Sequence, residues 1–188
     1  MVHDGLKLTL PAFFPRVMAL NQVVEVDTYI PGCAPPPDLT LQGIGALLKG
    51  ELPPKGTVLS PNKSLCSTCS LNDTKPEKVL IRELKRVHQS KIDPQTCFLV
   101  QGIFCMGPAT RTGCGERCIK GGMPCRGCFG PLDNVLDQGL SMLSALASIL
   151  DFSPPEGREL SRVLENLPDP AGYFYRFSLP SSLWGRGV

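Results

Sequence analysis

Long apolar stretches are missing from this chain of 188 residues. The longest one, Leu140 to Leu150, is flanked by Asp137 and Asp151 and falls well short of the roughly 20 apolar residues that cross a bilayer. The N-terminal segment MVHDGLKLTLPAFF also lacks the basic start, long apolar run and small-residue cleavage site of a secretory signal. We therefore expect a soluble, cytoplasmic protein with no membrane span, in a compartment where thiols stay reduced.

A large excess of positive or negative charge is also missing. The chain has 19 Lys and Arg against 17 Asp and Glu, for a net charge of +2. A protein that follows nucleic-acid phosphates needs a basic stripe, so we expect no nucleic-acid partner. The sequence also shows no nucleophile paired with a base, no phosphate loop and no paired carboxylates, so it gives no support for bond-making chemistry in this chain.

Aromatic residues make up only 6% of the sequence, whereas 19 prolines and 19 glycines together make up about a fifth of it. This composition predicts a loop-rich protein. Loops with so little apolar material need another source of order, and bound metal is a usual one in a small domain, because ligation free energy becomes folding free energy.

Three regular elements are predicted in the first half of the chain. Val23 to Ile30 is rich in β-branched residues and predicts a strand. Leu39 to Leu48 has apolar residues at helical spacing and predicts a short helix, capped by Asp38 and stopped at Gly50. A capping box precedes a third segment and predicts a helix from about Lys75 to Gln89.

In the second half, Leu132 to Leu150 predicts a helix, and a shorter helix is expected around Glu156 to Leu167. The last segment, GYFYRFSLPSSLW, is too aromatic for a free linker. We expect it to pack on this domain or on a neighbouring one.

The nine cysteines carry the strongest signal. Two CxxC pairs, at 66–69 and 125–128, enclose four further cysteines, and two intervening residues allow both thiolates of a pair to reach one metal centre. The simplest partition by chain order gives two sets of four. One set is Cys66, Cys69, Cys97 and Cys105, and the other is Cys114, Cys118, Cys125 and Cys128.

Glycines surround these cysteines, and without side chains they would let backbone amides approach cluster sulfurs and raise the reduction potential. They stand at positions 102, 107, 113, 115, 121, 122, 127 and 130. Composition alone leaves alternatives open, namely structural zinc in four-cysteine sites, disulfides in a secreted chain, and unrelated reduced thiols.

Four segments together resemble a known family. They are PGCAPPPDL (31 to 39), CSTCSLNDTKPEK (66 to 78), CFLVQGIFCMGPATRTGCGERC (97 to 118) and MPCRGCFGP (123 to 131). They are similar to the small subunit of cytosolic NiFe hydrogenases, of the methyl-viologen-reducing and sulfhydrogenase type. The resemblance covers about residues 15 to 180, including the segment DPAGYFYRFSLP.

The resemblance implies an electron relay. In that family the small subunit conducts electrons through proximal, medial and distal clusters, between the nickel-iron site of a large subunit and a flavin- or iron-sulfur-bearing acceptor. It implies two all-cysteine 4Fe-4S clusters here. The distal one would be held by Cys66, Cys69, Cys97 and Cys105, and the medial one by Cys114, Cys118, Cys125 and Cys128.

Cys33 matches the last ligand of the family's proximal cluster, whose other cysteines lie upstream in a flavodoxin-like domain. No cysteine precedes Cys33 in this chain, so a third cluster is expected only if upstream ligands are supplied. We expect a fragment of a longer protein rather than a genuine short form, because a domain rarely begins on one strand with its apolar faces uncovered.

The expected fold is α+β and loop-rich. Residues 1–50 would be a remnant of the α/β flavodoxin-like domain, and residues 51–188 an iron-sulfur domain with a C-terminal helix and tail. The first functional hypothesis is an electron-transfer subunit of a soluble NiFe hydrogenase, with hydrogen chemistry in the partner large subunit. The alternative is a free-standing or degenerate polyferredoxin-like protein without that partner.

Overall fold

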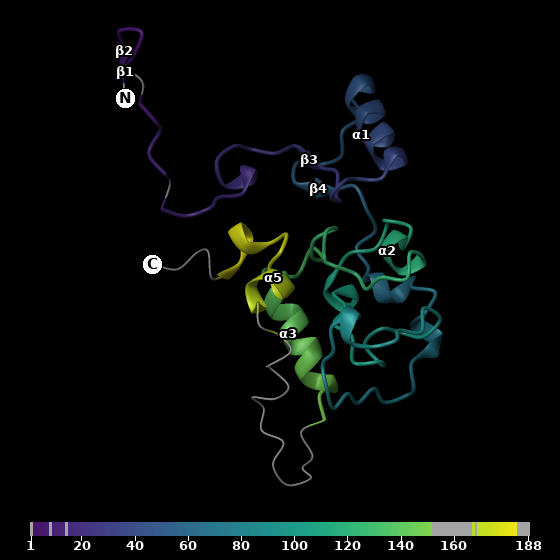
Figure 1. Ribbon diagram of the computed structural model, residues 1–188. Coiled ribbons are helices and arrows are strands. Elements are labelled where there is room, and N and C mark those ends of the chain that lie inside the picture. The colour runs from purple at the N-terminus through teal and green to yellow at the C-terminus, as the bar shows by residue number, and fades with distance from the viewer. Residues whose placement is uncertain (1, 8, 14, 152–166, 168, 184–188) are drawn as a thin grey trace.

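The computed structural model describes residues 2–7, 9–13, 15–151, 167 and 169–183. Within these ranges the regular elements are short and long loops join them (Figure 1). The α-helices are α1 (Pro37–Lys49), α2 (Arg117–Lys120), α3 (Gln138–Ile149) and α5 (Pro170–Phe174), and the strands are β1 (Val2–His3), β2 (Leu6–Lys7), β3 (Thr28–Tyr29) and β4 (Thr57–Val58). Short 3-10 helices lie at Leu20–Gln22, Leu65–Ser67, Asn72–Thr74, Val87–Gln89, Gly107–Ala109 and Leu179–Ser181.

Helix α1 and the parallel pair β3–β4 form a small N-terminal layer, which lies above α2, α3 and α5 in Figure 1. The helix begins after Pro36, with a proline at its first position, and ends at Gly50, whose φ of 70° is left-handed and suits glycine. The predicted helix and its stop are confirmed. The predicted cap is wrong, because Asp38 lies inside the first turn, where its negative charge suits the helix dipole.

The predicted strand from Val23 to Ile30 is much too long. Only Thr28–Tyr29 pairs, and it does so with the two residues of β4. β-branched residues favour an extended chain only where a neighbouring strand supplies hydrogen bonds and packing. Among the described residues no longer partner is present, and Val23 and Val24 are exposed.

The helix predicted from Lys75 to Gln89 is wrong. Apart from the 3-10 turn at its end, this segment is irregular, with isolated bridges at Ile81 and Lys85, because its backbone bonds to distant parts of the chain. The N–H of Ile81 donates to Ile149 O at 2.8 Å, and the N–H of Lys85 donates to Gly102 O at 2.8 Å. Ile81 is almost fully buried, so these tertiary contacts override the local helix preference.

Helix α3 confirms the helix predicted in the second half, but it starts at Gln138 rather than at Leu132. The start is fixed by Asp137, whose Oδ1 accepts a hydrogen bond from Leu140 N at 2.8 Å. Met142 and Leu146 on its inner face are buried. The helix expected around Glu156 to Leu167 lies outside the described residues, except for Leu167.

The aromatic tail packs on the domain, as predicted. Helix α5 lies against α3 (Figure 1), and the rings of Tyr173 and Phe174 meet the Phe104 ring edge-on at centroid distances of 5.2 and 5.0 Å. Phe104 directly precedes Cys105, so the tail supports the part of the core that carries this cysteine.

Loops supply most of the core. Its largest fully buried side chains include Leu84, Phe98, Ile103 and Met106, alongside Met142 and Leu146 of α3. Within the described part of the chain, no helix is both long and apolar enough to span a bilayer.

Candidate iron-sulfur centres

Four of the predicted ligands surround one small cavity in the core, the first cavity. Cys66 lies on the 3-10 helix Leu65–Ser67, Cys69 follows it, and Cys97 and Cys105 are buried at the two ends of a turn-rich loop. The free volume is only about 20 Å³. The remaining lining residues are Leu65, Leu71, Lys75, Phe98, Leu99, Gly107 and Ile119.

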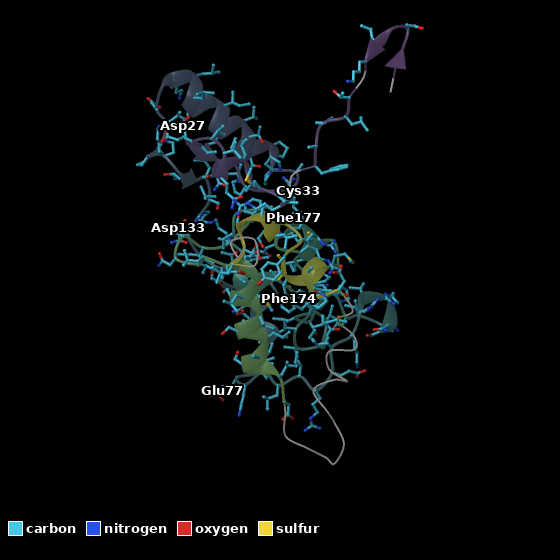
Figure 2. All side chains as sticks on the ribbon, turned by 90° about the vertical axis from the view of Figure 1, so that its left-hand side faces the viewer. Asp27, Cys33, Glu77, Asp133, Phe174 and Phe177 are labelled. Atoms are coloured by element: carbon cyan, nitrogen blue, oxygen red, sulfur yellow. The ribbon has the colours of Figure 1, made fainter. Side chains whose placement is uncertain are left out.

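Five thiols surround a neighbouring space of about 150 Å³, the second cavity. They comprise the other predicted set, Cys114, Cys118, Cys125 and Cys128, and also Cys33. Cys33 follows β3 and lies close to where the N-terminal layer meets the body of the protein (Figure 2). The other lining residues are Ala34, Pro36, Leu65, Thr110, Glu116, Arg117, Ile119, Arg126 and Phe129.

The two cavities are close neighbours. Leu65 and Ile119 line both of them. A hydrogen bond also joins the two sets of thiols, because the N–H of Cys125 donates to Sγ of Cys105 at 3.3 Å. A cysteine of one set is thus linked through a single hydrogen bond to the backbone of a cysteine of the other.

Backbone N–H groups converge on the sulfurs. The N–H of Gly107 donates to the Cys105 sulfur, and the N–H of Gly127 donates to the Cys125 sulfur, each two residues further on. A Cβ on Gly107 would lie 3.2 Å from Cys66 Sγ and 3.6 Å from Cys105 Sγ, so this glycine keeps the backbone close to two thiols. Two of the eight glycines that the sequence suggested therefore act in this way.

Burial makes these thiols reluctant to ionise. It raises the pKa of Cys66, Cys69 and Cys128, raises that of Cys125 to about 12, and raises that of Cys105 further. A thiolate at such a position needs a compensating cation and hydrogen-bond donors, and a metal centre supplies the cation.

The donor set fits iron-sulfur clusters. A 4Fe-4S cluster takes four thiolates, one on each iron, so the sulfurs surround a body larger than one ion. A structural zinc instead draws four thiolates to about 2.3 Å from a single point. Four thiols line the first cavity, and four more, with Cys33, line the second, so each cavity has the four cysteines that a 4Fe-4S cluster takes.

Charged side chains are distributed unequally around the cavities. Lys75 lines the first, and Glu116, Arg117 and Arg126 line the second. The sequence could not place Lys75 at this cavity, because it predicted that Lys75 begins a helix. In the structure Lys75 instead follows the 3-10 turn Asn72–Thr74.

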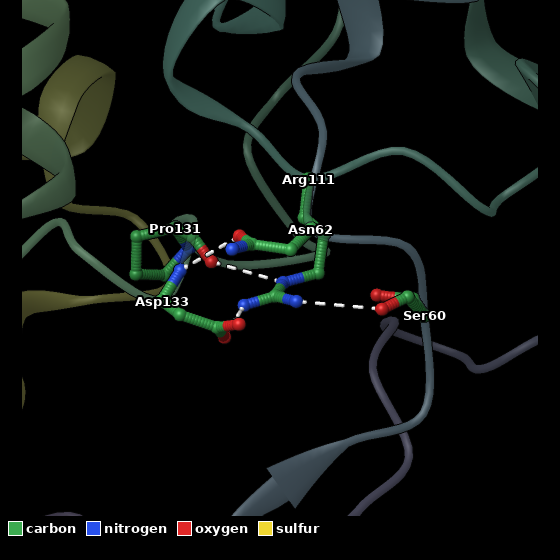
Figure 3. A network of polar contacts seen from close by, with 5 residues as sticks. All are labelled: Ser60, Asn62, Arg111, Pro131 and Asp133. Carbon is green, nitrogen blue, oxygen red and sulfur yellow. Dashed lines mark hydrogen bonds and ion pairs between the residues drawn. The ribbon is translucent and has the colours of Figure 1, made fainter.

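Arg111 lies between the cysteines in the sequence, but in the structure it holds two loops together (Figure 3). It is almost fully buried, pairs with Asp133, and donates to Pro131 O at 3.1 Å and to Ser60 O at 3.4 Å. The Asp133 N–H in turn donates to Asn62 Oδ1 at 3.0 Å. The network joins residues 60–62 to the loop that follows Cys128.

No family model matches the chain, but individual relatives do. The chain is 36% identical over 179 residues to the iron-sulfur subunit of the F420-non-reducing hydrogenase of Archaeoglobus profundus, an alignment that covers 94% of this chain and 54% of that protein. It is 32% identical over 126 residues to the delta subunit of sulfhydrogenase 2 of Pyrococcus furiosus, covering 64% of this chain and 43% of that protein. The chain spans about half the length of the Archaeoglobus relative.

A shorter relative is matched over most of its length. It is the corresponding F420-non-reducing hydrogenase subunit of Methanothermus fervidus, which is 40% identical over 109 residues, or 57% of this chain and 86% of that protein. The thiols gathered around two adjoining cavities agree with these matches. The chain therefore belongs to the family of the F420-non-reducing hydrogenase iron-sulfur subunit.

Proposed function

We propose that this protein is an iron-sulfur electron-transfer subunit of a hydrogenase and relays electrons through two 4Fe-4S clusters. Cys66, Cys69, Cys97 and Cys105 would hold the first centre, and Cys114, Cys118, Cys125 and Cys128 the second. The clusters supply the one-electron redox chemistry, and the chain's own residues hold them at fixed positions and exclude water.

The observation that carries the proposal is the closeness of the two thiol sets. Electron transfer between centres slows steeply with distance and is favoured by a short, continuous path. The hydrogen bond from Cys125 N–H to Cys105 Sγ, at 3.3 Å, offers such a path through one backbone segment. Leu65 and Ile119, which line both cavities, are buried and apolar, so the wall between the two sets offers water no polar partner.

Donors to the sulfurs suit a redox role. N–H groups of Gly107 and Gly127 point at Cys105 and Cys125, and such hydrogen bonds stabilise the more negative, reduced form of a cluster. A structural zinc site has no reduction potential for such hydrogen bonds to adjust, because Zn²⁺ does not change its charge.

The finer assignments rest on the family resemblance. The first centre would be the distal cluster and the second the medial one, with Cys33 a ligand of a proximal cluster only if upstream ligands are supplied. The partners would be a NiFe large subunit, where hydrogen reacts, and a flavin- or iron-sulfur-bearing acceptor, in the cytoplasm. The division at residues 50 and 51 and the flavodoxin-like origin of the first part stay predictions.

Anaerobic purification followed by metal and acid-labile sulfide analysis tests the proposal. We expect a brown protein with about eight irons and eight sulfides per chain. A colourless protein with zinc and no iron would sink the redox role. Recovery of the iron-loaded chain without any nickel-containing subunit would favour the free-standing alternative.

A further inference from the structure

Lys75 is the only charged side chain among the described residues that line the first cavity. It is half-buried, and its neighbours there are thiols and apolar side chains such as Leu71 and Phe98. A charge in such surroundings is screened much less than a charge in water. Its effect on any group in the cavity is correspondingly strong.

The lysine is held in place. Its backbone N–H donates to Asn72 O at 3.1 Å, and its Nζ donates to Asn72 Oδ1 at 2.9 Å. The same turn is tied to the thiols, because Thr74 Oγ1 accepts a hydrogen bond from Cys97 N at 2.9 Å and donates to Leu71 O at 2.7 Å. The ammonium position is thus coupled to a cysteine of the first set.

The ammonium acts on Cys66. Cys66 and Lys75 line the same small cavity, so the ammonium lies near the sulfur and favours negative charge on it. Glu116 has the opposite influence on the same set. Its Oε2 accepts a hydrogen bond from Ser70 N at 3.1 Å, and its negative charge contributes to the raised pKa of Cys69.

We infer that Lys75 is a positioning residue whose fixed ammonium raises the reduction potential of the first centre. This inference rests on the proposed function. Reduction adds one negative charge to the centre, and a fixed cation beside it stabilises the reduced state more than the oxidised one. Asn72 holds that cation at the wall of the first cavity.

The test is a potentiometric titration of the whole iron-loaded protein followed by electron paramagnetic resonance. Lys75→Met removes the charge and keeps most of the side-chain length. We expect the potential of the first centre to fall by the equivalent of at least a tenfold change in its reduction equilibrium, which is about 59 mV for one electron. The second centre should shift less, and Lys75→Arg should restore most of the loss.

Matched variants assign and check the effect. Cys69→Ser identifies the signal of the first centre, because it changes one ligand of that centre only. Lys78→Met removes an exposed lysine three residues away that does not line the cavity, and it should leave both potentials unchanged. Glu116→Gln keeps an acceptor for Ser70 N–H, loses the negative charge, and should raise the potential of the first centre.

The outcomes separate the two levels of the proposal. Absence of iron from the wild-type protein would overturn the proposed function and with it the role of Lys75. Full iron with an unchanged first potential in Lys75→Met, or an equal fall at both centres, would overturn the role of Lys75 alone. If Lys75→Met fails to take up iron, Asn72→Ala decides, because it removes the acceptor that holds the ammonium in place. An unchanged or higher potential of the first centre in that variant contradicts the inference.

Discussion

The first and second cavities have similar chemistry but different construction. The first has four thiols in a tight, buried space, and all of them come from the segment between Cys66 and Cys105. The second is larger and more charged, and it has five thiols, of which Cys33 and Cys118 are exposed. The difference indicates that the first set of thiols belongs to the folded core, whereas the second lies at a junction with the N-terminal layer.

Contacts of the N-terminal layer support this view. Asp38 of α1 lies 4.0 Å from Arg117 of α2. The N–H of Cys33 donates to the Cys128 sulfur. A Cβ on Gly32 would lie 3.0 Å from the Phe129 ring, so the turn that carries Cys33 packs closely on the second site. The second set of thiols is therefore in direct contact with the N-terminal layer.

The largest effect should come from Cys105→Ser. Cys105 is 7% exposed, lines the first cavity and accepts the hydrogen bond from Cys125, so its loss affects both the centre and the core. We expect iron to fall from about eight to about four per chain, together with a marked loss of thermal stability. Cys118→Ser, at an exposed position of the second set, should also cost about four irons but far less stability. Equal loss of stability in the two variants would break the distinction between the two sites.

Phe174→Ala should come next, because it removes the tail's support behind Cys105. Phe174 is buried against Phe104, and truncation of a buried Phe costs about 3 to 5 kcal/mol of unfolding free energy. The exposed Phe177 gives a matched control, for which Phe177→Ala should cost well under about 1 kcal/mol (Figure 2). Chemical denaturation of both variants measures the difference, and similar values would show that the tail does not support the core.

Gly107→Ala should have an intermediate effect confined to the first centre. The added methyl group would press on Cys66 and Cys105 in the tighter cavity, and overpacking costs about 1 to 3 kcal/mol. We expect reduced iron occupancy of the first centre with the second intact. Gly45→Ala, in α1 with no atom within 4 Å of the added Cβ, should instead stabilise slightly. Iron analysis of the two variants checks this, and full first-centre occupancy in Gly107→Ala would show that the cavity has more room.

Cys33→Ser should have the smallest effect. Four other thiols line the second cavity, and the contact of Cys33 with Cys128 is made by its backbone N–H, which serine retains. We expect the iron content of this chain to stay at about eight. A drop to about four would make Cys33 a ligand of the second centre and would require one of the other four thiols to be free.

Local sequence features predicted part of this structure well. Helix α1 with its stop at Gly50, helix α3 and the packed aromatic tail follow from periodicity, a terminal glycine and apolar content. Chain order also separates the thiols into the two groups of four that surround the cavities, because each group is nearly contiguous in sequence. Ligation of iron by these groups stays a prediction.

Long-range features were beyond reach of the sequence. The segment around Ile81 does not form the predicted helix, because the backbone of Ile81 hydrogen-bonds to Ile149 and Asp151. Cys33 joins the second set of thiols through a turn packed on Phe129, and its spacing from the other cysteines carries no sign of that contact. Lys75 reaches the first cavity only because a 3-10 turn at Asn72–Thr74 replaces the expected helix start.

The most direct test of the central claim is electron paramagnetic resonance of the fully reduced, iron-loaded protein. Two 4Fe-4S clusters whose ligands are joined by the Cys125 to Cys105 hydrogen bond should give a spectrum broadened by magnetic coupling between them. That coupling should vanish in Cys105→Ser, leaving the signal of one isolated cluster. A wild-type spectrum that is the simple sum of two uncoupled signals, or the signal of a single cluster, would contradict the relay.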